Sequence, residues 1–313
     1  MTTYWRRVRY EGDTVPWELR EIPGKGYAAF ATRSFKKGDW ICTEFPVTWI
    51  HEHHPFNSQQ LDEIDEKVEQ MSEEDCAAFL DMANVYNVDE TSVNSGIFMT
   101  NCFDMTDSIF GKSCAMYLAL GRLNHSCSPN VQQTHIPETT EEVAYASRDI
   151  NVGDELNDCY IDLRQSRAAR REELRDLYKF TCECDCCTGK MYQSDTTTDE
   201  EVQKLIAEDD RMRVKAYSYQ DIITDLVEQN EDAQLALDVA MQTCKQLESA
   251  RYLVWSVRYI PEAYMMVHQL AKELYQKKLA KSYLEKAYQL SLTLEGPRSK
   301  ETMRLAKLVK DFR

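Results

Sequence analysis

The first half of the chain alternates short β-prone runs with glycine turns, a pattern typical of small antiparallel sheets. In each run apolar and polar positions alternate or β-branched and aromatic residues gather. The predicted strands cover residues 17–22, 27–32, 40–45, 130–136 and 142–147. This part of the chain is therefore predicted to be rich in short strands.

Apolar residues at helical spacing predict helices in three segments of this part of the chain. From Gln59 to Asn84 apolar residues recur every three or four positions, and Ser72 is the predicted N-cap of a second helix there. Residues 115–123 predict a short buried helix, and residues 167–177 predict a charged helix. The strands and helices together indicate an α+β fold.

The second half of the chain changes character after Lys190. A polar linker at 194–199 is followed by a long stretch almost without glycine or proline, in which apolar residues follow helical spacing. Residues 261–294 resemble one tetratricopeptide-like (TPR-like) helix pair of about 34 residues. An ordinary helical hairpin accounts for the same spacing. We predict an all-α C-terminal region with a boundary near residue 195.

Composition and charge narrow the class of protein. The 313 residues are 43% hydrophobic and 29% charged, as in globular proteins, which excludes disordered and fibrous classes. The chain has 37 Lys and Arg against 53 Asp and Glu, a net charge of −16. This balance argues against direct nucleic-acid binding and favours a basic partner.

The sequence also predicts the cellular compartment in which the protein is found. No run of about 18 apolar residues is present, so no membrane association is expected. The start of the chain lacks the apolar stretch of a signal peptide. We therefore expect a cytoplasmic or nuclear protein, or one found in both, whose thiols stay reduced unless they bind metal.

Cysteine spacing gives the clearest chemical signal. Of the 11 cysteines, four fall between Cys182 and Cys187, and Cys182, Cys184 and Cys187 have the C-x-C-x-x-C spacing of a thiolate zinc site. Cys186 is constrained by its neighbour and is not the first choice as a ligand. A structural zinc site closes with four ligands, so a distant cysteine or histidine must supply the last one.

Three other motifs have ordinary explanations when each is taken alone. Gly24–Ala29 fits the G-x-G-x-x-A dinucleotide pattern, but no helix follows to hold a pyrophosphate. The polar heptapeptide Asn124–Asn130 could be a structural turn, or His125 and Cys127 could form a nucleophilic pair, although their spacing suits one poorly. Tyr160 at the end of a short strand could be a core aromatic residue.

The order of these motifs removes the ambiguity. Gly24-x-Gly26, the Asn-His-Ser-Cys-x-Pro-Asn heptapeptide, Gly153-x-Glu155 with Tyr160, and the cysteine cluster follow one another as in SET-domain protein lysine methyltransferases. The stretch from Cys159 to Cys182 resembles the SET-and-MYND (SMYD) branch. Between residues 50 and 100, however, only Cys76 and three histidines could bind metal. The chain therefore resembles a member of that branch that lacks the MYND zinc module.

The resemblance implies an organisation in three parts. Residues 1–180 would form a SET domain with a pseudoknot and a helical insertion at about 57–105. Residues 181–195 would form the post-SET zinc segment. Residues 196–313 would form a helical, TPR-like domain.

The resemblance also implies an S-adenosylmethionine (SAM) site, one structural Zn²⁺ and a catalytic tyrosine. Tyr160 would orient the substrate amine, and Tyr178 would line the lysine channel. Cys127 would complete the zinc site with Cys182, Cys184 and Cys187. The cofactor-binding residues would be Lys25, Gly26, Tyr27, Asn101, Asn124, His125, Tyr160 and Phe180.

The implied activity is methylation of lysine in a basic protein or peptide, such as a histone tail or a non-histone protein. A contrasting hypothesis is a non-catalytic SET-like scaffold that recruits partners through its acidic helical tail. Retention of Tyr160 and of the cofactor-site residues favours the enzyme.

Overall fold

The computed structural model describes residues 7–312 apart from 13, 52–55, 88, 90, 106–110, 229–232 and 250–252. The chain divides into two compact units. The first contains residues 1–124, 131–158 and 298–300, and the second contains 125–130, 159–297 and 301–313. The short loop 125–130 thus belongs to the unit that otherwise begins at Cys159.

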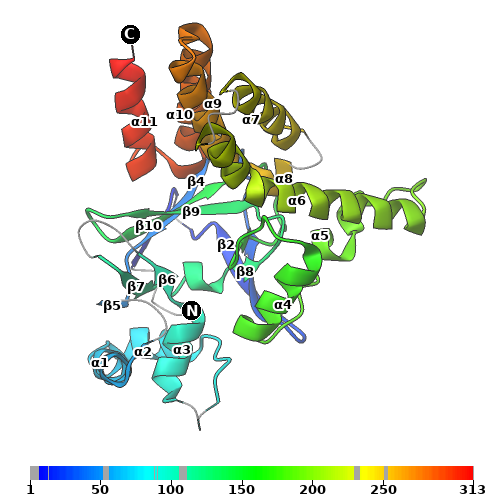
Figure 1. The fold of residues 1–313 in the computed structure, drawn as a ribbon. Coiled ribbons are helices and arrows are strands. Elements are labelled where there is room, and N and C mark those ends of the chain that lie inside the picture. The colour runs from blue at the N-terminus through cyan, green and yellow to red at the C-terminus, as the bar shows by residue number, and fades with distance from the viewer. Residues whose placement is uncertain are drawn as a thin grey trace. The chain divides into compact units, whose positions relative to one another are not determined.

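The first unit holds the strands, which are arranged in small sheets (Figure 1). A four-stranded antiparallel sheet has the order β1 (Val8–Arg9), β4 (Trp40–Glu44), β10 (Glu141–Ala146) and β9 (Val131–Ile136). A hairpin joins β2 (Trp17–Ile22) to β3 (Gly26–Ala31), and a third sheet has the order β5 (Thr48–His51), β7 (Ser113–Met116) and β6 (Phe103–Asp104). The short strands β8 (Asn124–His125) and β11 (Asn157–Asp158) form the fourth.

The five predicted strands are confirmed as β2, β3, β4, β9 and β10. The β2–β3 turn depends on glycine, because Gly24 has φ 78° and Gly26 has φ 75°, values that a residue with a Cβ atom rarely adopts. Gly26 opens a strand and not a helix. The turn therefore lacks the helix N-terminus that a dinucleotide-binding loop requires.

Three capped helices form the insertion in the first unit: α1 (Ser58–Glu69), α2 (Glu73–Leu80) and α3 (Val93–Asn101). Asn57 and Gln60 form a capping box at α1. Ser72 accepts a hydrogen bond from the backbone N–H of Asp75, which confirms its predicted role as the cap of α2. Ile64 and Val68 are buried on one face of α1, as the spacing predicts.

The predicted helix over residues 115–123 is wrong. Residues 113–116 form the central strand β7, where Ala115 pairs with both Trp49 and Phe103, and a short 3-10 helix, η2 (Leu120–Arg122), follows. Nearly every side chain in this stretch is buried. A segment that is apolar on all sides has no periodicity from which a helix and a strand can be distinguished.

A buried carboxylate fixes the turn into η2. The two oxygens of Glu44 accept hydrogen bonds from the backbone N–H groups of Ala119, at 2.9 Å, and Leu120, at 2.8 Å. Burial raises the pKa of Glu44 to about 7. Glu142, its partner across β4 and β10, is also buried, and burial raises its pKa as well. The start of η2 therefore depends on a carboxyl group that lies away from water.

The second unit is mostly helical. Three short elements, α4 (Arg167–Tyr178), α5 (Asp185–Thr188) and η3 (Lys190–Tyr192), precede the long helix α6 (Asp199–Glu228). The remaining helices are α7 (Ala233–Leu247), α8 (Leu253–Ser256), α9 (Ile260–Glu273), α10 (Lys277–Glu295) and α11 (Lys300–Asp311). Helix α6 packs on α7, α7 on α9, and α9 on α10.

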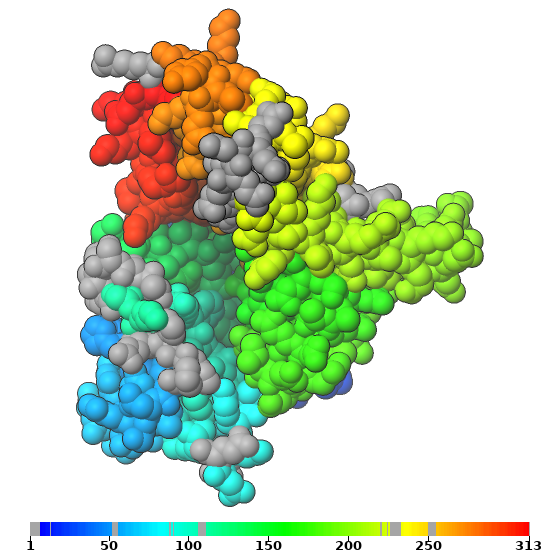
Figure 2. Space-filling model, in the orientation of Figure 1, coloured from blue at the N-terminus to red at the C-terminus, as the bar shows by residue number. Residues whose placement is uncertain are grey.

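Small residues bring the last helices close together. Val267 and Ala271 on α9 and Ala280 on α10 are fully buried between the helices. Ser291 and Thr302 place their hydroxyl oxygens 2.9 Å apart, and Figure 2 shows α10 in orange beside α11 in red. The α+β class with a mostly helical C-terminal region is confirmed. Whether the α9–α10 pair is TPR-like stays a prediction. Within the described residues, no helix has the length and apolar character needed to cross a membrane.

We expect the ionisation of Glu44 to make stability depend on pH. The pKa of Glu44 is raised from 4.5 to about 7 in the folded state. Between these pH values the side chain is therefore protonated in the folded chain and ionised in the unfolded chain. Stability contributed by the neutral acid is complete below pH 4.5 and is lost as pH rises through 7. The loss is about 3 kcal/mol.

Urea unfolding of the wild type and Glu44→Gln at pH 5 and pH 8 measures this effect. The variant lacks the titrating group, so between pH 5 and pH 8 its free energy of unfolding should fall by about 3 kcal/mol less than that of the wild type. Glu138→Gln, at an exposed position, is the control. An equal pH dependence for wild type and Glu44→Gln would contradict the prediction.

Candidate active site and metal centre

Four cysteine sulfurs converge in the second unit. Cys127 comes from the loop 125–130, and Cys182, Cys184 and Cys187 come from the segment after α4. All four sulfur atoms lie within 4.8 Å of one another. The Cys127 sulfur is 3.5 Å from that of Cys187 and 4.0 Å from that of Cys182. A tetrahedral zinc ion with Zn–S bonds of about 2.3 Å needs sulfur separations of about 3.8 Å, so these residues fit the ion.

Two left-handed turns shape the cysteine segment. Helix α4 ends at Lys179, which has φ 59°, and the chain then turns back toward the helix. Helix α5 starts after Cys184 and ends at Gly189, which has φ 82°. A Cβ atom at position 189 would lie 2.7 Å from Val202, so glycine is required there. The two turns thereby fold the segment from Cys182 to Cys187 into a compact knuckle.

Hydrogen bonds within the knuckle favour a thiolate at Cys184. The backbone N–H of Cys127 donates to the Cys184 sulfur at 3.4 Å. A hydrogen bond from the Cys127 thiol, followed by those from the other two thiols, lowers the pKa of Cys184. A deprotonated sulfur is the form that binds metal.

The remaining thiol of the segment, that of Cys186, has different surroundings. The Cys186 sulfur lies 3.2 Å from a guanidinium nitrogen of Arg213 and 3.9 Å from the Asp209 carboxylate. Burial raises the pKa of Cys186 to about 12. Within the described residues, the group that can hold a metal contains the other four cysteines and not Cys186.

Four rings lie next to the sulfur cluster in the second unit. The ring of Tyr160 is 5.4 Å from that of His125 and 5.0 Å from that of Tyr178. The centroid of the Phe180 ring lies 6.4 Å from that of the His125 ring. The structure thus brings together four residues that the sequence analysis selected as site residues.

His125 links the sulfur cluster to Tyr160. Its Nδ1 accepts a hydrogen bond of 3.0 Å from the backbone N–H of Tyr160, and its Nε2 lies 3.3 Å from the sulfur of Cys127. Burial lowers the pKa of His125 to about 4, so the ring is neutral at pH 7. Since Nδ1 is an acceptor, the proton is on Nε2 and points at the sulfur.

The burial of Cys127 argues against the alternative in which Cys127 and His125 form a nucleophilic pair. The side chain is fully buried, and its sulfur contacts two other cysteine sulfurs. A nucleophilic thiol must be reached by its substrate. The arrangement therefore favours a metal ligand over a hydrolytic cysteine.

In the first unit, Asn124 is held by Tyr27 of β3 and by Glu155, which forms an isolated bridge with Phe30. Its side-chain amide donates to the carbonyl oxygen of Tyr27 at 3.1 Å and to the carboxylate of Glu155 at 3.0 Å. Lys25 and Gly26 are exposed, and 43% of the Tyr27 surface is accessible. The backbone N–H of Lys25 is used in the turn, where it donates to Ile22.

Asn101 lies at the end of α3 in the first unit. Its amide nitrogen donates to the carbonyl oxygens of Ala83 and Ile97, both at 2.7 Å. Both amide protons are therefore committed to the fold. A cofactor contact of this side chain would have to use its oxygen.

Two buried arginines beside the sulfurs were not anticipated. The side chain of Arg170 is 1% exposed and that of Arg213 is 0% exposed. Arg170 donates to the Cys127 sulfur at 3.2 Å. Both residues lie in charged helical stretches, where the sequence pattern indicates solvent exposure, so spacing alone held no signal for them.

Comparison with known proteins agrees with this geometry. The sequence profile of the SET domain matches residues 26–161. The chain carries a SET domain. The match includes Tyr27, Asn124, His125, Cys127 and Tyr160, while the three-cysteine segment follows it.

Several methyltransferases are homologous to this SET domain. The chain is 29% identical over 176 residues to histone-lysine N-methyltransferase set5 of Schizosaccharomyces pombe, covering 56% of this chain and 51% of the relative. Human histone-lysine N-methyltransferase SMYD3 is 38% identical over 94 residues, 30% of this chain and 22% of the relative. Mouse N-lysine methyltransferase SMYD2 is 34% identical over 135 residues, 42% of this chain and 31% of the relative. The matched regions span about half of these relatives or less.

We expect the sulfur cluster to bind one zinc ion per chain. Cys127→Ser should reduce bound zinc below about half an equivalent, because a structural site loses stability with one of its four ligands. Metal analysis by mass spectrometry after mild purification measures the zinc. Cys186→Ser is the matched control and should retain the full equivalent. Full zinc in Cys127→Ser, or loss of zinc in Cys186→Ser alone, would refute this ligand set.

Proposed function

We propose that the protein is a SAM-dependent protein lysine N-methyltransferase. The position of Tyr160 carries the proposal. Its ring lies between those of His125 and Tyr178, and its backbone N–H is fixed by His125. The homologous SET domains belong to proteins named as lysine methyltransferases.

The aromatic side chains would need only to exclude water and to align the substrate amine. SAM, when bound, supplies an activated methyl group to the lysine nitrogen. A free lysine has a pKa of about 10.4, so the surrounding side chains must favour the neutral amine by excluding water. Tyr160 would orient that amine with its hydroxyl group, and Tyr178 would enclose the lysine stem. Alignment of this kind can lower a barrier by about 7–11 kcal/mol.

We propose a set of SAM-binding residues from the resemblance to SET domains. Lys25, Gly26 and Tyr27 would present backbone from the β2–β3 turn. Their exposure supports this role. Asn124 and the neutral His125 would contact the polar end or the adenine edge, and Phe180 would lie against the adenine. Asn101 would contribute its amide oxygen, since its nitrogen is already used.

The zinc ion would be structural. Cys127, Cys182, Cys184 and Cys187 fill all four positions of a tetrahedral site, and a closed site leaves no place for a substrate. Binding would fix the loop that carries His125, because Cys127 is only two residues further along. The metal would thus support the active site without taking part in the reaction.

The proposed substrate is a lysine in a basic protein segment, in a histone or a non-histone protein. The net charge of −16 supports this choice, since it favours encounter with a basic partner. We propose that the protein works in the cytoplasm or the nucleus, where its thiols would remain reduced. The domain limits proposed with this function are 1–180, 181–195 and 196–313.

Tyr160→Phe tests the function. Removal of the hydroxyl should reduce methyl transfer by about 100-fold or more, the usual range for a group that positions a proton-bearing reactant. Transfer of labelled methyl groups to histones and to cell-lysate proteins measures the rate, and calorimetry measures SAM binding, which should persist. Tyr275→Phe, at a residue that is 89% exposed, is the control. Labelling that is absent in the wild type, or undiminished in Tyr160→Phe, would count against the proposal.

A further inference from the structure

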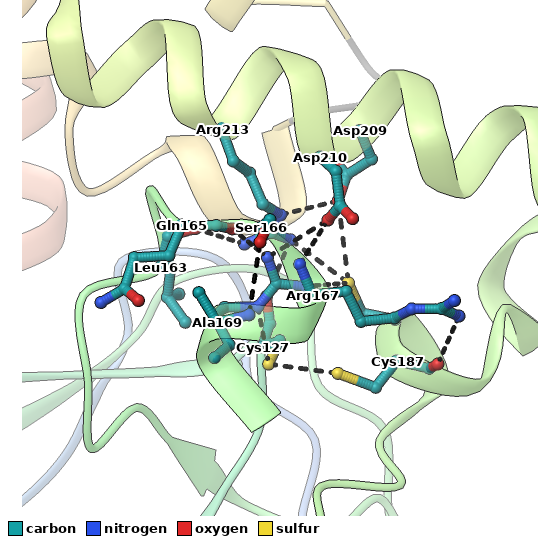
Figure 3. Close-up of polar contacts among 12 residues, drawn as sticks. Cys127, Leu163, Gln165, Ser166, Arg167, Ala169, Cys187, Asp209, Asp210 and Arg213 are labelled. Atoms are coloured by element: carbon teal, nitrogen blue, oxygen red, sulfur yellow. Dashed lines mark hydrogen bonds and ion pairs between the residues drawn. The ribbon is translucent and has the colours of Figure 1, made fainter. Parts of the chain in front are cut away.

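The side chain of Arg213 is the most enclosed charge next to the sulfur cluster. It reaches from helix α6 toward Leu163 and Cys127 (Figure 3). One terminal nitrogen donates to the carbonyl oxygen of Leu163 at 2.8 Å, and the other donates to the carbonyl oxygen of Cys127 at 3.1 Å. One planar group therefore joins two backbone segments that are far apart in the sequence.

Helix α6 and helix α8 hold the guanidinium in place. Its Nε donates to the Asp209 carboxylate at 2.6 Å, and the ring of Trp255 lies 4.5 Å from its central carbon. The indole N–H of Trp255 donates to the other oxygen of Asp209 at 2.7 Å. Asp209 and Trp255 are themselves buried. The guanidinium is thus pre-oriented before it reaches either carbonyl group.

Both carbonyl groups lie close to residues of the proposed reaction. Leu163 follows Tyr160 by three residues. Cys127 carries a sulfur of the cluster and contacts His125, which in turn holds the backbone of Tyr160. Arg213 therefore contacts both ends of a chain of contacts that runs through Cys127, His125 and Tyr160.

Tyr259, the N-cap residue of α9, holds the same segment after β11. The hydroxyl of Tyr259, at the start of α9, accepts a hydrogen bond of 2.9 Å from the backbone N–H of Leu163 and donates to Asp162 at 3.1 Å. The peptide groups on either side of Leu163 are thus bound by two different helices. Tyr259 has no contact with the sulfur cluster among the interactions of the described residues.

The charge of Arg213 also suits the metal centre. Four thiolates around a zinc ion carry a net charge of −2, and burial of such a charge is costly unless it is compensated. Arg170 and Arg213 both lie against this cluster. Asp209 forms an ion pair with Arg213 within the helix, which offsets part of the Arg213 charge and fixes its position in α6.

We propose that Arg213 is a positioning residue for methyl transfer, which couples the metal centre to the segment from Tyr160 to Leu163 from within the helical region. The proposal rests on the proposed function of the site. Arg213 touches no reacting atom. It sets the distance between the loop that carries His125 and the segment that carries Tyr160.

Arg213→Lys is the informative substitution. Lysine keeps the charge, but its compact ammonium group cannot span two carbonyl groups as the planar guanidinium does. We expect kcat for each zinc-loaded molecule to fall by about 10- to 100-fold, with a smaller change in KM for SAM, because small displacements of reacting groups have large effects on rate. We also expect a chelator to remove zinc at least about tenfold faster.

Tyr259→Phe tests the contact at Leu163 separately from the contact at the sulfur cluster. It loses the hydroxyl group that binds Leu163 and Asp162 and leaves the sulfur cluster untouched, so kcat should fall while the rate of zinc removal stays at the wild-type value. Arg211→Lys, on the exposed side of the same helix, is the matched control and should change neither rate. Tyr259→Phe also keeps the proposal testable if Arg213→Lys does not fold.

The outcomes distinguish positioning from simple stability. A purely structural arginine would lower zinc content and activity together, and kcat for each zinc-loaded molecule would stay constant, which would overturn the proposal. Unchanged kcat in Tyr259→Phe as well as Arg213→Lys would do the same. If the wild type transfers no methyl group at all, the proposed function fails, and the positioning role fails with it. An active wild type with an unaffected Arg213→Lys would leave the function standing and remove only the positioning role.

Discussion

The convergence of four cysteine sulfurs is the constraint on which the candidate site depends. Cys127 lies 55 residues before Cys182, yet their sulfurs are 4.0 Å apart. Hydrophobic packing alone would not hold four thiols in this arrangement, whereas a divalent ion stabilises it directly. His125 contacts the Cys127 sulfur and also the backbone of Tyr160, so it connects the sulfur cluster with the tyrosine that we propose to be catalytic.

Two buried ionisable side chains bind backbone groups before and within the heptapeptide Asn124–Asn130. Before it, in the first unit, the Glu44 carboxylate accepts the N–H groups that open η2. Within it, in the second unit, the Arg213 guanidinium donates to the carbonyl of Cys127. The Glu44 side chain accepts from backbone N–H groups and the Arg213 guanidinium donates to a backbone carbonyl group, so both kinds of buried backbone group have partners. Each interaction is expensive to lose, because it would leave a charge buried without its partners.

Much of the fold could be predicted from the sequence, and the failures have physical reasons. Alternation of apolar and polar residues identified β2, whereas β4 and β10 are buried on both faces and were recognised as short β-prone runs next to turns. Residues 115–123 were misassigned because a segment buried on every side has no pattern. Serine caps and glycine turns were reliable since their chemistry is local, as Ser72 and Gly24 illustrate.

The candidate site was only partly visible in the sequence. Spacing selected Cys182, Cys184 and Cys187, but the fourth sulfur followed from resemblance to a family, because distance along the chain says nothing about contact in space. The network of Arg213 escaped notice for another reason. Asp209 and Arg213 are four residues apart on a helix, a spacing typical of exposed ion pairs, and only the fold reveals that this one is buried.

X-ray absorption at the zinc edge of the purified chain tests the central claim most directly. The account predicts four sulfur neighbours at about 2.3 Å and no nitrogen in the first coordination sphere. The same spectrum should be seen when Cys186 is replaced by serine. A sphere of three sulfurs and one nitrogen, with His125 in place of Cys127, would contradict the account, because His125 could not then hold the backbone of Tyr160 as described.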